Sequence, residues 1–186
     1  MLATTNFGFL KPEDSDDVDV DELTDSLDKL DIILEAIQNP VYGKMKKTGG
    51  DQNLPNNTET KITYNTADFE NGGVVDLAND QFVINKAGLY TINWACVISP
   101  INPQNTDIQT LCYKNSTLVA VVTAGRSIFG GGGHAMIGTV DLSLQVSDTV
   151  SFKAFQSSGA SQQLVGTVTG FENWASIKRW QFDGLS

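Results

Sequence analysis

The stretch that decides the fold is Gly88-Leu89-Tyr90-Thr91-Ile92-Asn93-Trp94-Ala95-Cys96-Val97-Ile98. Within it, large apolar side chains recur at every second position: Tyr90, Ile92, Trp94, Cys96 and Ile98. Successive side chains of a β-strand point to opposite faces of the sheet, so this spacing gathers the apolar ones on one face. Thr91, Asn93 and Ala95 fall on the other face. The pattern predicts a strand with one face in a core and a wetter face opposite.

The same period of two recurs in the C-terminal two thirds of the chain. Further strand-like runs are 61–64, 81–84, 108–114, 117–123, 134–144, 149–155, 164–169 and 174–182. Residues that favour turns separate them, among them Asn71-Gly72-Gly73 and the four glycines at 130–133. Eight to ten short strands without a second helix predict a mainly β fold, a single jelly-roll β-sandwich.

A different period marks residues 18–39. Apolar residues there are spaced alternately by three and four positions: Val20, Leu23, Leu27, Leu30, Leu34 and Ile37. This is the a and d spacing of a coiled coil, which is narrower than the stripe of a helix on a globular core. Asp19 is a suitable N-cap, and Asn39-Pro40 stops the helix. We therefore expect one short coiled-coil helix whose six apolar residues form a self-association seam. Packing against its own domain is the alternative.

The segments on either side of this helix lack a periodic pattern. Residues 1–17 contain Lys11-Pro12, which breaks a helix, so we expect an extended arm. The apolar side chains of this arm require a partner to bury them, which makes Phe7, Phe9 and Leu10 candidate attachment residues. Residues 40–60 are rich in Gly, Pro, Asn and Thr, which predicts a linker. The expected order is therefore arm 1–17, acidic helix 18–39, linker 40–60 and jelly-roll head domain 61–186.

The 186 residues include 12 basic and 22 acidic side chains, a formal net charge of −10. Eleven of the acidic residues but only two of the basic ones lie in residues 1–40, so the remainder is nearly neutral. Proteins bind nucleic acid and anionic membranes through Lys and Arg, so neither is an expected partner. The sequence shows no signal peptide and no bilayer-spanning stretch, so we expect a soluble protein made in a cytosol.

Few residues suit catalysis or metal binding. The single histidine, His134, follows four glycines and so lacks the rigid setting that a catalytic base requires. Cys96 and Cys112 lie in strand-like runs and belong to no CxxC or Cys/His group, so buried free thiols are expected. The acids at 17–21 resemble the start of a calcium loop, but its glycine and its final glutamate are missing. We expect no catalytic residue, no metal site and no cofactor.

The run from Phe82 to Ile92 resembles the hallmark of the trimeric jelly-roll superfamily of complement globular heads and tumour necrosis factor. That hallmark is an aromatic residue, five further residues, and then Gly-x-Tyr-x-aromatic, from which Ile92 departs at the last position. The turn 144–150 is similar to the L-x-x-G-D-x-V of that family, with Ser147 in the place of glycine. The resemblance implies a homotrimer with a binding or structural role and no enzymatic activity. It implies a jelly-roll core that contains Phe82, Gly88, Tyr90 and Trp94.

The N-terminal segment has a likeness of its own. Residues 8–13 (GFLKPE) and 16–23 (DDVDVDEL) resemble the opening of many tailed-bacteriophage fibre, appendage and minor structural proteins, where such a segment precedes a trimeric stem. The resemblance implies that the N-terminus fastens a homotrimer to other virion proteins, in the capsid or the tail. It also implies that the protein, made in the host cytoplasm, is located in the virion.

The two resemblances imply a bacteriophage virion structural protein, a surface appendage that is either a head fibre or decoration protein or a tail adhesin. Loops at 71–73, 102–105, 126–133 and 157–163 are then candidates for contact with host-surface glycan or protein. The alternative is a carbohydrate-active enzyme of the depolymerase type on a β-scaffold, against which stands the lack of a recognisable acid/base pair. A secreted signalling ligand would require an export route that the sequence does not show.

Overall fold

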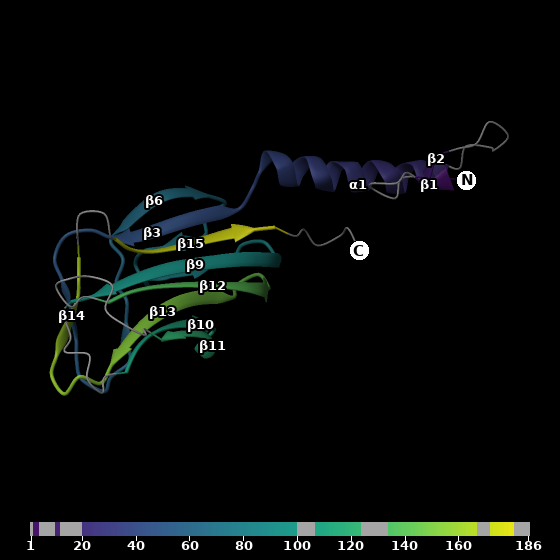
Figure 1. Cartoon of the computed structure of the whole chain (residues 1–186). Helices are drawn as coiled ribbons and strands as arrows, with labels where there is room; N and C mark the ends of the chain where they lie inside the picture. The colour runs from purple at the N-terminus through teal and green to yellow at the C-terminus, as the bar shows by residue number, and fades with distance from the viewer. Residues whose placement is uncertain are drawn as a thin grey trace. The chain divides into compact units, whose positions relative to one another are not determined.

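The computed structural model describes residues 2–3, 10–11, 20–99, 107–123, 134–166 and 172–180, with the side chains of 2–3, 10–11, 20, 22 and 35–38 excepted. The chain forms two units. One comprises Met1–Pro40 with Phe182–Ser186, and the other comprises Val41–Gln181. We call the second unit the head. Figure 1 shows the strands of the head and the helix of the first unit.

The helix of the first unit, α1, spans Val20–Gln38. It ends before Asn39-Pro40, as the sequence predicts, whereas Asp19, the predicted N-cap, lies outside the described residues. Two short strands, β1 (Leu2–Ala3) and β2 (Leu10–Lys11), pair antiparallel. The arm was expected to be extended, and both of these strands lie within it. Such short backbone pairing requires no apolar period and therefore leaves no signal in the sequence.

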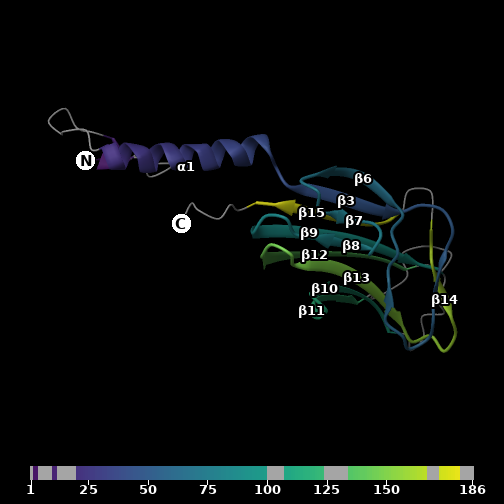
Figure 2. The ribbon, with the colours of Figure 1, turned by 180° about the vertical axis from the view of Figure 1, so that it is seen from behind.

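The head contains two antiparallel sheets. The six-stranded sheet has the order β11-β10-β13-β8-β7, with β5 also paired to β13. Its strands are β5 (Thr60–Lys61), β7 (Val75–Asp76), β8 (Gln81–Val83), β10 (Ile108–Lys114), β11 (Thr117–Thr123) and β13 (Thr149–Gln156). Figure 2 shows β7 and β8 of this sheet from behind.

The seven-stranded sheet has the order β4-β14-β9-β15-β3-β6, with β12 paired along the whole of β9. Its strands are β3 (Tyr42–Lys47), β4 (Gln52–Leu54), β6 (Thr66–Asn71), β9 (Gly88–Ile98), β12 (His134–Leu144), β14 (Gln162–Leu164) and β15 (Asn173–Arg179). Strands β9 to β12 have the bounds that the period of two predicts. The predicted jelly-roll β-sandwich with one N-terminal helix is confirmed.

The segment 40–60, predicted as a linker, is part of the head instead. It contains β3, which pairs with β15 on one side and β6 on the other, and it contains β4. Gly43, Met45 and Lys47 of β3 face the interior, while Lys44 and Lys46 face outward. A strand whose inward series includes glycine and lysine lacks the apolar alternation that reveals strands, so only its neighbours in the sheet identify it. The head begins at Val41 and not at residue 61.

The core lies between the two sheets and is centred on Trp94. The indole Nε1 donates a hydrogen bond of 2.9 Å to Thr110 Oγ1 of the other sheet, and the ring lies 5.5 Å from the ring centre of Phe152. Gly138 of β12 stands opposite Trp94 of β9. A Cβ atom at this glycine would lie 2.1 Å from Cζ2 of Trp94, so the indole occupies the space that a side chain would need.

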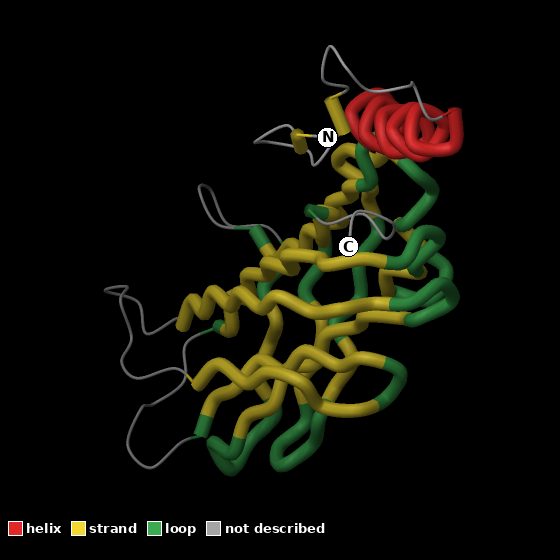
Figure 3. The backbone as a smooth tube through the Cα atoms, turned by 90° about the vertical axis from the view of Figure 1, so that its right-hand side faces the viewer, coloured by secondary structure: helices red, strands yellow, loops and turns green. Residues whose placement is uncertain are grey.

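Short turns join the strands, as the loops in Figure 3 show. Asn115 and Ser116 both have positive φ and form the two-residue hairpin between β10 and β11. Ser147, which stands where the resemblance has glycine, has φ 72°. The backbone therefore adopts the left-handed conformation that favours glycine, and the turn is held by the hydrogen bond from Gln145 N to Asp148 Oδ2 at 2.7 Å.

Candidate functional site

The first candidate site is the apolar row on α1. The structure describes the side chains of four predicted seam residues, and each exposes between 40% and 53% of its surface: Leu23, Leu27, Leu30 and Leu34. The side chains of Val20 and Ile37 lie outside the described residues. Asp21, Asp25, Asp28 and Asp31 are exposed beside the row. A regular row of exposed leucines flanked by charge is the surface that a second helix covers in a coiled coil.

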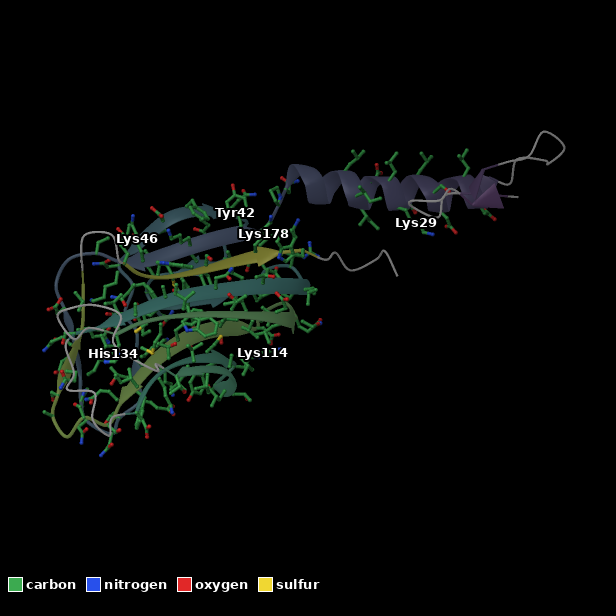
Figure 4. All side chains as sticks on the ribbon, viewed as in Figure 1. Lys29, Tyr42, Lys46, Lys114, His134 and Lys178 are labelled. Atoms are coloured by element: carbon green, nitrogen blue, oxygen red, sulfur yellow. The ribbon has the colours of Figure 1, made fainter. Side chains whose placement is uncertain are left out.

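The second candidate site is an outward surface of β6, β3, β15 and Trp180, the residue after β15, that we call the aromatic face. It comprises Tyr42, Lys44, Lys46, Asp68, Phe69, Trp174, Lys178 and Trp180. The rings of Tyr42 and Phe69 meet edge to face at 5.8 Å, and Tyr42 stands opposite Lys178 (Figure 4). Lys178 Nζ lies 3.8 Å from the ring centre of Trp180. The face thus contains an aromatic pair between β3 and β6 and a lysine ammonium over the ring of a tryptophan.

One carboxylate neutralises part of the charge on the aromatic face. Asp68 pairs with Lys46 Nζ at 2.9 Å and with Lys44 Nζ at 3.1 Å. The hydrogen bond from Lys46, and then that from Lys44, lowers the pKa of the Asp68 carboxyl. Lys44 Nζ also lies 5.5 Å from the ring centre of Trp174. Lys44 therefore combines an ion pair with Asp68 and a position over aromatic surface.

The third candidate site is a side of the sandwich that we call the lateral edge. It is formed by β11 and β12, which are neighbours and are each the last strand of their sheet in the described part of the head. Three large apolar side chains are exposed on it: Leu118 (44%), Val121 (47%) and Ile137 (70%). None of the seven residues of β11 carries a charge. Such a surface is typical of contacts between proteins.

The residues with catalytic potential lie in the core. His134 is buried at the start of β12, and burial lowers its pKa (Figure 4). Neither of its ring nitrogens has a hydrogen-bond partner within the described part of the chain. Cys96 and Cys112 are buried and free, as predicted, and burial raises the pKa of Cys112 to about 12 and that of Cys96 still higher. Thiols that stay protonated at neutral pH are poor nucleophiles.

The carboxylates with a shifted pKa serve as structural partners. Glu59 accepts hydrogen bonds from the Tyr113 hydroxyl at 2.6 Å and from Lys153 Nζ at 2.9 Å. These two bonds, first that from Tyr113 and then that from Lys153, lower the pKa of the Glu59 carboxyl. A general acid at neutral pH requires a raised pKa, which is the opposite direction. Among the described residues, no three His, Cys, Asp or Glu side chains gather closely enough to hold a metal ion. No described helix is long and apolar enough to cross a membrane.

The structure places the other predicted site residues as follows. Phe82, Tyr90, Trp94 and Gly88 are all buried in the head. Phe7 and Phe9 lie outside the described residues, as do the loops 102–105 and 126–133; Leu10 belongs to β2, with its side chain outside the description. In the loop 71–73, Asn85 Nδ2 donates to Gly72 O at 2.9 Å. Sequence reasoning missed the aromatic face, because β3 was assigned to a linker.

No protein-family model and no curated protein matches the sequence. Solved structures do match the fold. The match to murine APRIL at pH 8.0 covers 76% of this chain and 99% of that one, with 8% identity and a TM-score of 0.55. For murine APRIL at pH 5.0 the coverage is the same, with 10% identity and a TM-score of 0.56. Eiger TNF from S. frugiperda matches over 77% of this chain and 94% of its own, with 7% identity and a TM-score of 0.54.

At such low identity these matches report on fold, and function is argued from surfaces. The matched structures are covered almost completely, and the share of this chain that they cover is close to that of the head. The defining residues of the sequence hallmark, Phe82, Gly88 and Tyr90, are buried in the same domain. The head is a jelly roll of the tumour necrosis factor type.

Proposed function

We propose that this protein is a homotrimeric structural protein of a bacteriophage virion, a surface appendage that is anchored by its N-terminal unit and displays its head as a binding module. The observation that carries the proposal is the exposed leucine row of α1, in a chain whose head already buries its own core. Because the core of the head consists of residues of one chain, the head does not require a second chain to bury it. The leucine row of α1 does require a second chain to cover it.

The energetics of the helix favour association. An isolated helix of 19 residues is marginal in water, and a row of half-exposed leucines gains about 1.5–3 kcal/mol for each side chain that becomes fully buried. The heads, tethered to the helices, raise the effective concentration of each seam for the others. Leucine at both a and d positions does not fix the number of strands. The number three is supported by the likeness of the N-terminal segment to phage stems and by the fold of the head.

The location in the virion rests on the N-terminal segment. Its sequence resembles the anchoring segments of phage appendages, and it carries most of the net charge of the chain. An acidic anchor fits a virion protein that presents Lys and Arg, in the capsid or in the tail. The head then faces outward, where a host-surface glycan or protein is the candidate ligand. The proposed role involves no enzymatic activity, cofactor, nucleic acid or membrane.

Light scattering of the purified chain tests the trimer. We expect the mass of three chains at micromolar concentration, and a single-chain mass would contradict the proposal. A chain that begins at Pro40 tests the anchor, because it keeps the whole head. We expect this truncated protein to fold and to be absent from particles. Its incorporation into virions would show that the acidic segment is not the attachment device.

Location and ligand require separate measurements. Cryo-EM or immunogold labelling of the particle distinguishes a head fibre from a tail adhesin. Binding of the purified protein to host cells, together with a tail location, would identify an adhesin, whereas a capsid location without binding would identify a decoration protein. Incubation with host cell-wall polysaccharide tests for a depolymerase. We expect no released reducing ends.

A further inference from the structure

One end of the head presents a surface without charge. Two segments form most of it, 52–58 (QNLPNNT) and 156–164 (QSSGASQQL), and they are joined by the pairing of β4 with β14. Neither segment contains an acidic or a basic residue, and most of their side chains are amides or hydroxyls. We call the exposed and partly exposed members, with the residue after β9, the amide patch: Asn53, Asn57, Ser99, Ser158, Ser161 and Gln163.

A row of three polar side chains crosses the amide patch. Gln163 of β14 stands opposite Asn53 of β4, and on its other side it exchanges backbone and hydroxyl contacts with Ser99. Ser99 N donates to Gln163 O at 2.8 Å, and Gln163 N donates to Ser99 Oγ at 3.3 Å. Leu54 and Leu164, the next residues of the two strands, are buried in the core, so Asn53 and Gln163 face outward. Opposite side chains of paired strands lie about 5 Å apart, so the row spans about 10 Å.

A buried glutamine holds the two segments together. Gln156 is fully buried at the end of β13, and its Nε2 donates to Leu54 O at 3.0 Å and to Ala160 O at 2.9 Å. Its Oε1 accepts hydrogen bonds from Ser158 N at 2.8 Å and from Ser158 Oγ at 2.7 Å. The loop after β13 is thus fixed to the end of β4 before any ligand arrives. Hydrogen-bonding groups that are already ordered lose less entropy when they bind.

The chemistry of the amide patch fits a neutral ligand with many hydroxyl groups. Within the described part of the chain, four of its side chains make no hydrogen bond to another residue: Asn53, Asn57, Ser161 and Gln163. Amide and hydroxyl side chains can both donate and accept hydrogen bonds, and so can the hydroxyl groups of a sugar. The two segments contain no charge and no exposed large apolar side chain, so they offer little to a charged peptide or to an apolar surface.

The amide patch lies at the end of the head that is farthest from the point where the chain enters it. The first residue of the head, Val41, accepts a hydrogen bond from Arg179 N at 3.0 Å, and Arg179 stands opposite Tyr90 of β9. Leu164 of β14 stands opposite Ile98, at the other end of the same strand. About 25 Å of β9 separates Tyr90 from Ile98. Figures 1 and 2 show β14 at the opposite end of the head from the start of β3.

We propose that the amide patch binds a neutral glycan through the row of Asn53, Gln163 and Ser99, with Asn57 and Ser161 beside it. This assignment rests on the proposed function, a displayed binding module, and it gives that module a site and a class of ligand. A few neutral hydrogen bonds bind one sugar weakly. Three amide patches in a homotrimer bind a repeating polysaccharide far more tightly, because each contact raises the effective concentration of the next.

An array of immobilised oligosaccharides tests this assignment on the full chain, labelled with a fluorophore. The array carries neutral oligosaccharides of glucose, galactose, mannose and N-acetylglucosamine beside anionic ones that contain sialic acid, uronic acid or sulfate. We expect the protein to be retained on at least one neutral oligosaccharide. Retention on anionic sugars alone, or on none, would overturn the inference. It would leave the proposed function standing, since that function fails by other results, a single-chain mass in light scattering or absence from virions.

Variants locate the binding surface. Asn53→Ala with Gln163→Ala is expected to weaken binding to the retained oligosaccharide about tenfold or more, because each neutral hydrogen bond that is lost costs a factor of roughly 2 to 10. The matched control is Gln145→Ala, which removes an exposed glutamine from the turn between β12 and β13, at the other end of the head, and should bind as the parent does. Calorimetric titration with the soluble oligosaccharide measures both, and circular dichroism checks that the variants are folded. A double variant that binds like the parent, or a control that loses binding equally, would overturn the assigned site.

Discussion

The helix and the head use apolar residues in opposite ways. In the head, the inward faces of β9 and β12 are covered by the six-stranded sheet of the same chain, and Trp94 is fully buried. On α1, the apolar row is as regular as any in the head, yet its leucines remain half exposed. Both segments have a clear hydrophobic period. They differ in whether the chain supplies the surface that covers it.

This difference shows that a hydrophobic period records the need for burial without specifying the partner. The head buries its core within one chain, so the stability of that core is expected not to require a further copy. In the proposed homotrimer the helix is covered by other copies, so its helicity is expected to depend on assembly. Substitutions that act on one unit only are the means to test the contrast.

The largest effect is expected from Gly138→Ala in the core of the head. The added Cβ would lie 2.1 Å from the Trp94 ring, so the indole or the strand must shift. Overpacking of this kind costs about 3 kcal/mol. Urea unfolding followed by tryptophan fluorescence measures the loss. Gly50→Ala, where the added Cβ meets no atom within 4 Å, is the control and should change stability by less than about 0.5 kcal/mol.

A change confined to the helix is expected from Leu27→Asp with Leu30→Asp. Both leucines belong to the exposed row, and charge at a and d positions prevents coiled-coil packing. Because a helix of this length is marginal alone, most of the helical ellipticity at 222 nm should disappear while the melting temperature of the head is unchanged. Asp25→Asn and Asp28→Asn, which lie beside the row, should retain the helix. Loss of the head transition in the leucine variant would contradict the independence of the two units.

The pH dependence of stability is expected to come from the head. Burial lowers the pKa of His134, so the unfolded state binds this proton more readily, and stability is lost as the pH falls below about 6.5. The lowered pKa values of Glu59 and Asp68 add a further loss below about pH 5, because these carboxylates are protonated first in the unfolded chain. Melting temperatures between pH 4 and 8 measure both steps. In His134→Leu, only the lower step should remain.

The smallest effect is expected from Ser147→Gly. Serine at φ 72° is strained by about 1–2 kcal/mol, whereas glycine adds about 0.5–1 kcal/mol of entropy to the unfolded chain, so a net gain of about 0.5 kcal/mol is expected. Asn115→Gly is the instructive counterpart. Its backbone is also left-handed, but its side-chain Oδ1 accepts a hydrogen bond from Thr149 N at 2.7 Å, so this variant should lose stability. Thermal unfolding of both variants against the parent measures the difference.

Sequence reasoning succeeded where a strand carries its own alternation. Strands β9, β10, β11 and β12 have the predicted bounds, and in β9 and β12 the apolar residues gather on one face. It failed for β3, where Gly43 and Lys47 replace apolar residues on the inward face and the lysines resemble a solvated linker. The aromatic face was missed with it, since β3 joins Trp174 of β15 to Phe69 of β6.

Local sequence also misjudged the setting of His134. Four preceding glycines suggested that it lacks rigid surroundings, but the residue opens β12 opposite Ile98, and its side chain is buried in the sandwich. The signal was present in the alternation of β12, where positions 134, 136 and 138 share one face. The four glycines before His134 were given more weight than this alternation, and the residue was therefore expected to lie in flexible surroundings. Position along a strand determines the direction of a side chain, whatever precedes the strand.

The sequence by itself determined the kinds of element, the faces that they bury, the end of the helix and the jelly-roll class, because periodicity is a local record of burial. Only the tertiary structure decided that 42–47 is a strand of the sheet, that Gly138 makes room for Trp94, and that apolar residues from distant segments meet as an edge and a face. These are pairings between residues far apart in the chain. Their energy depends on the fitting of two surfaces, and no single segment contains that information.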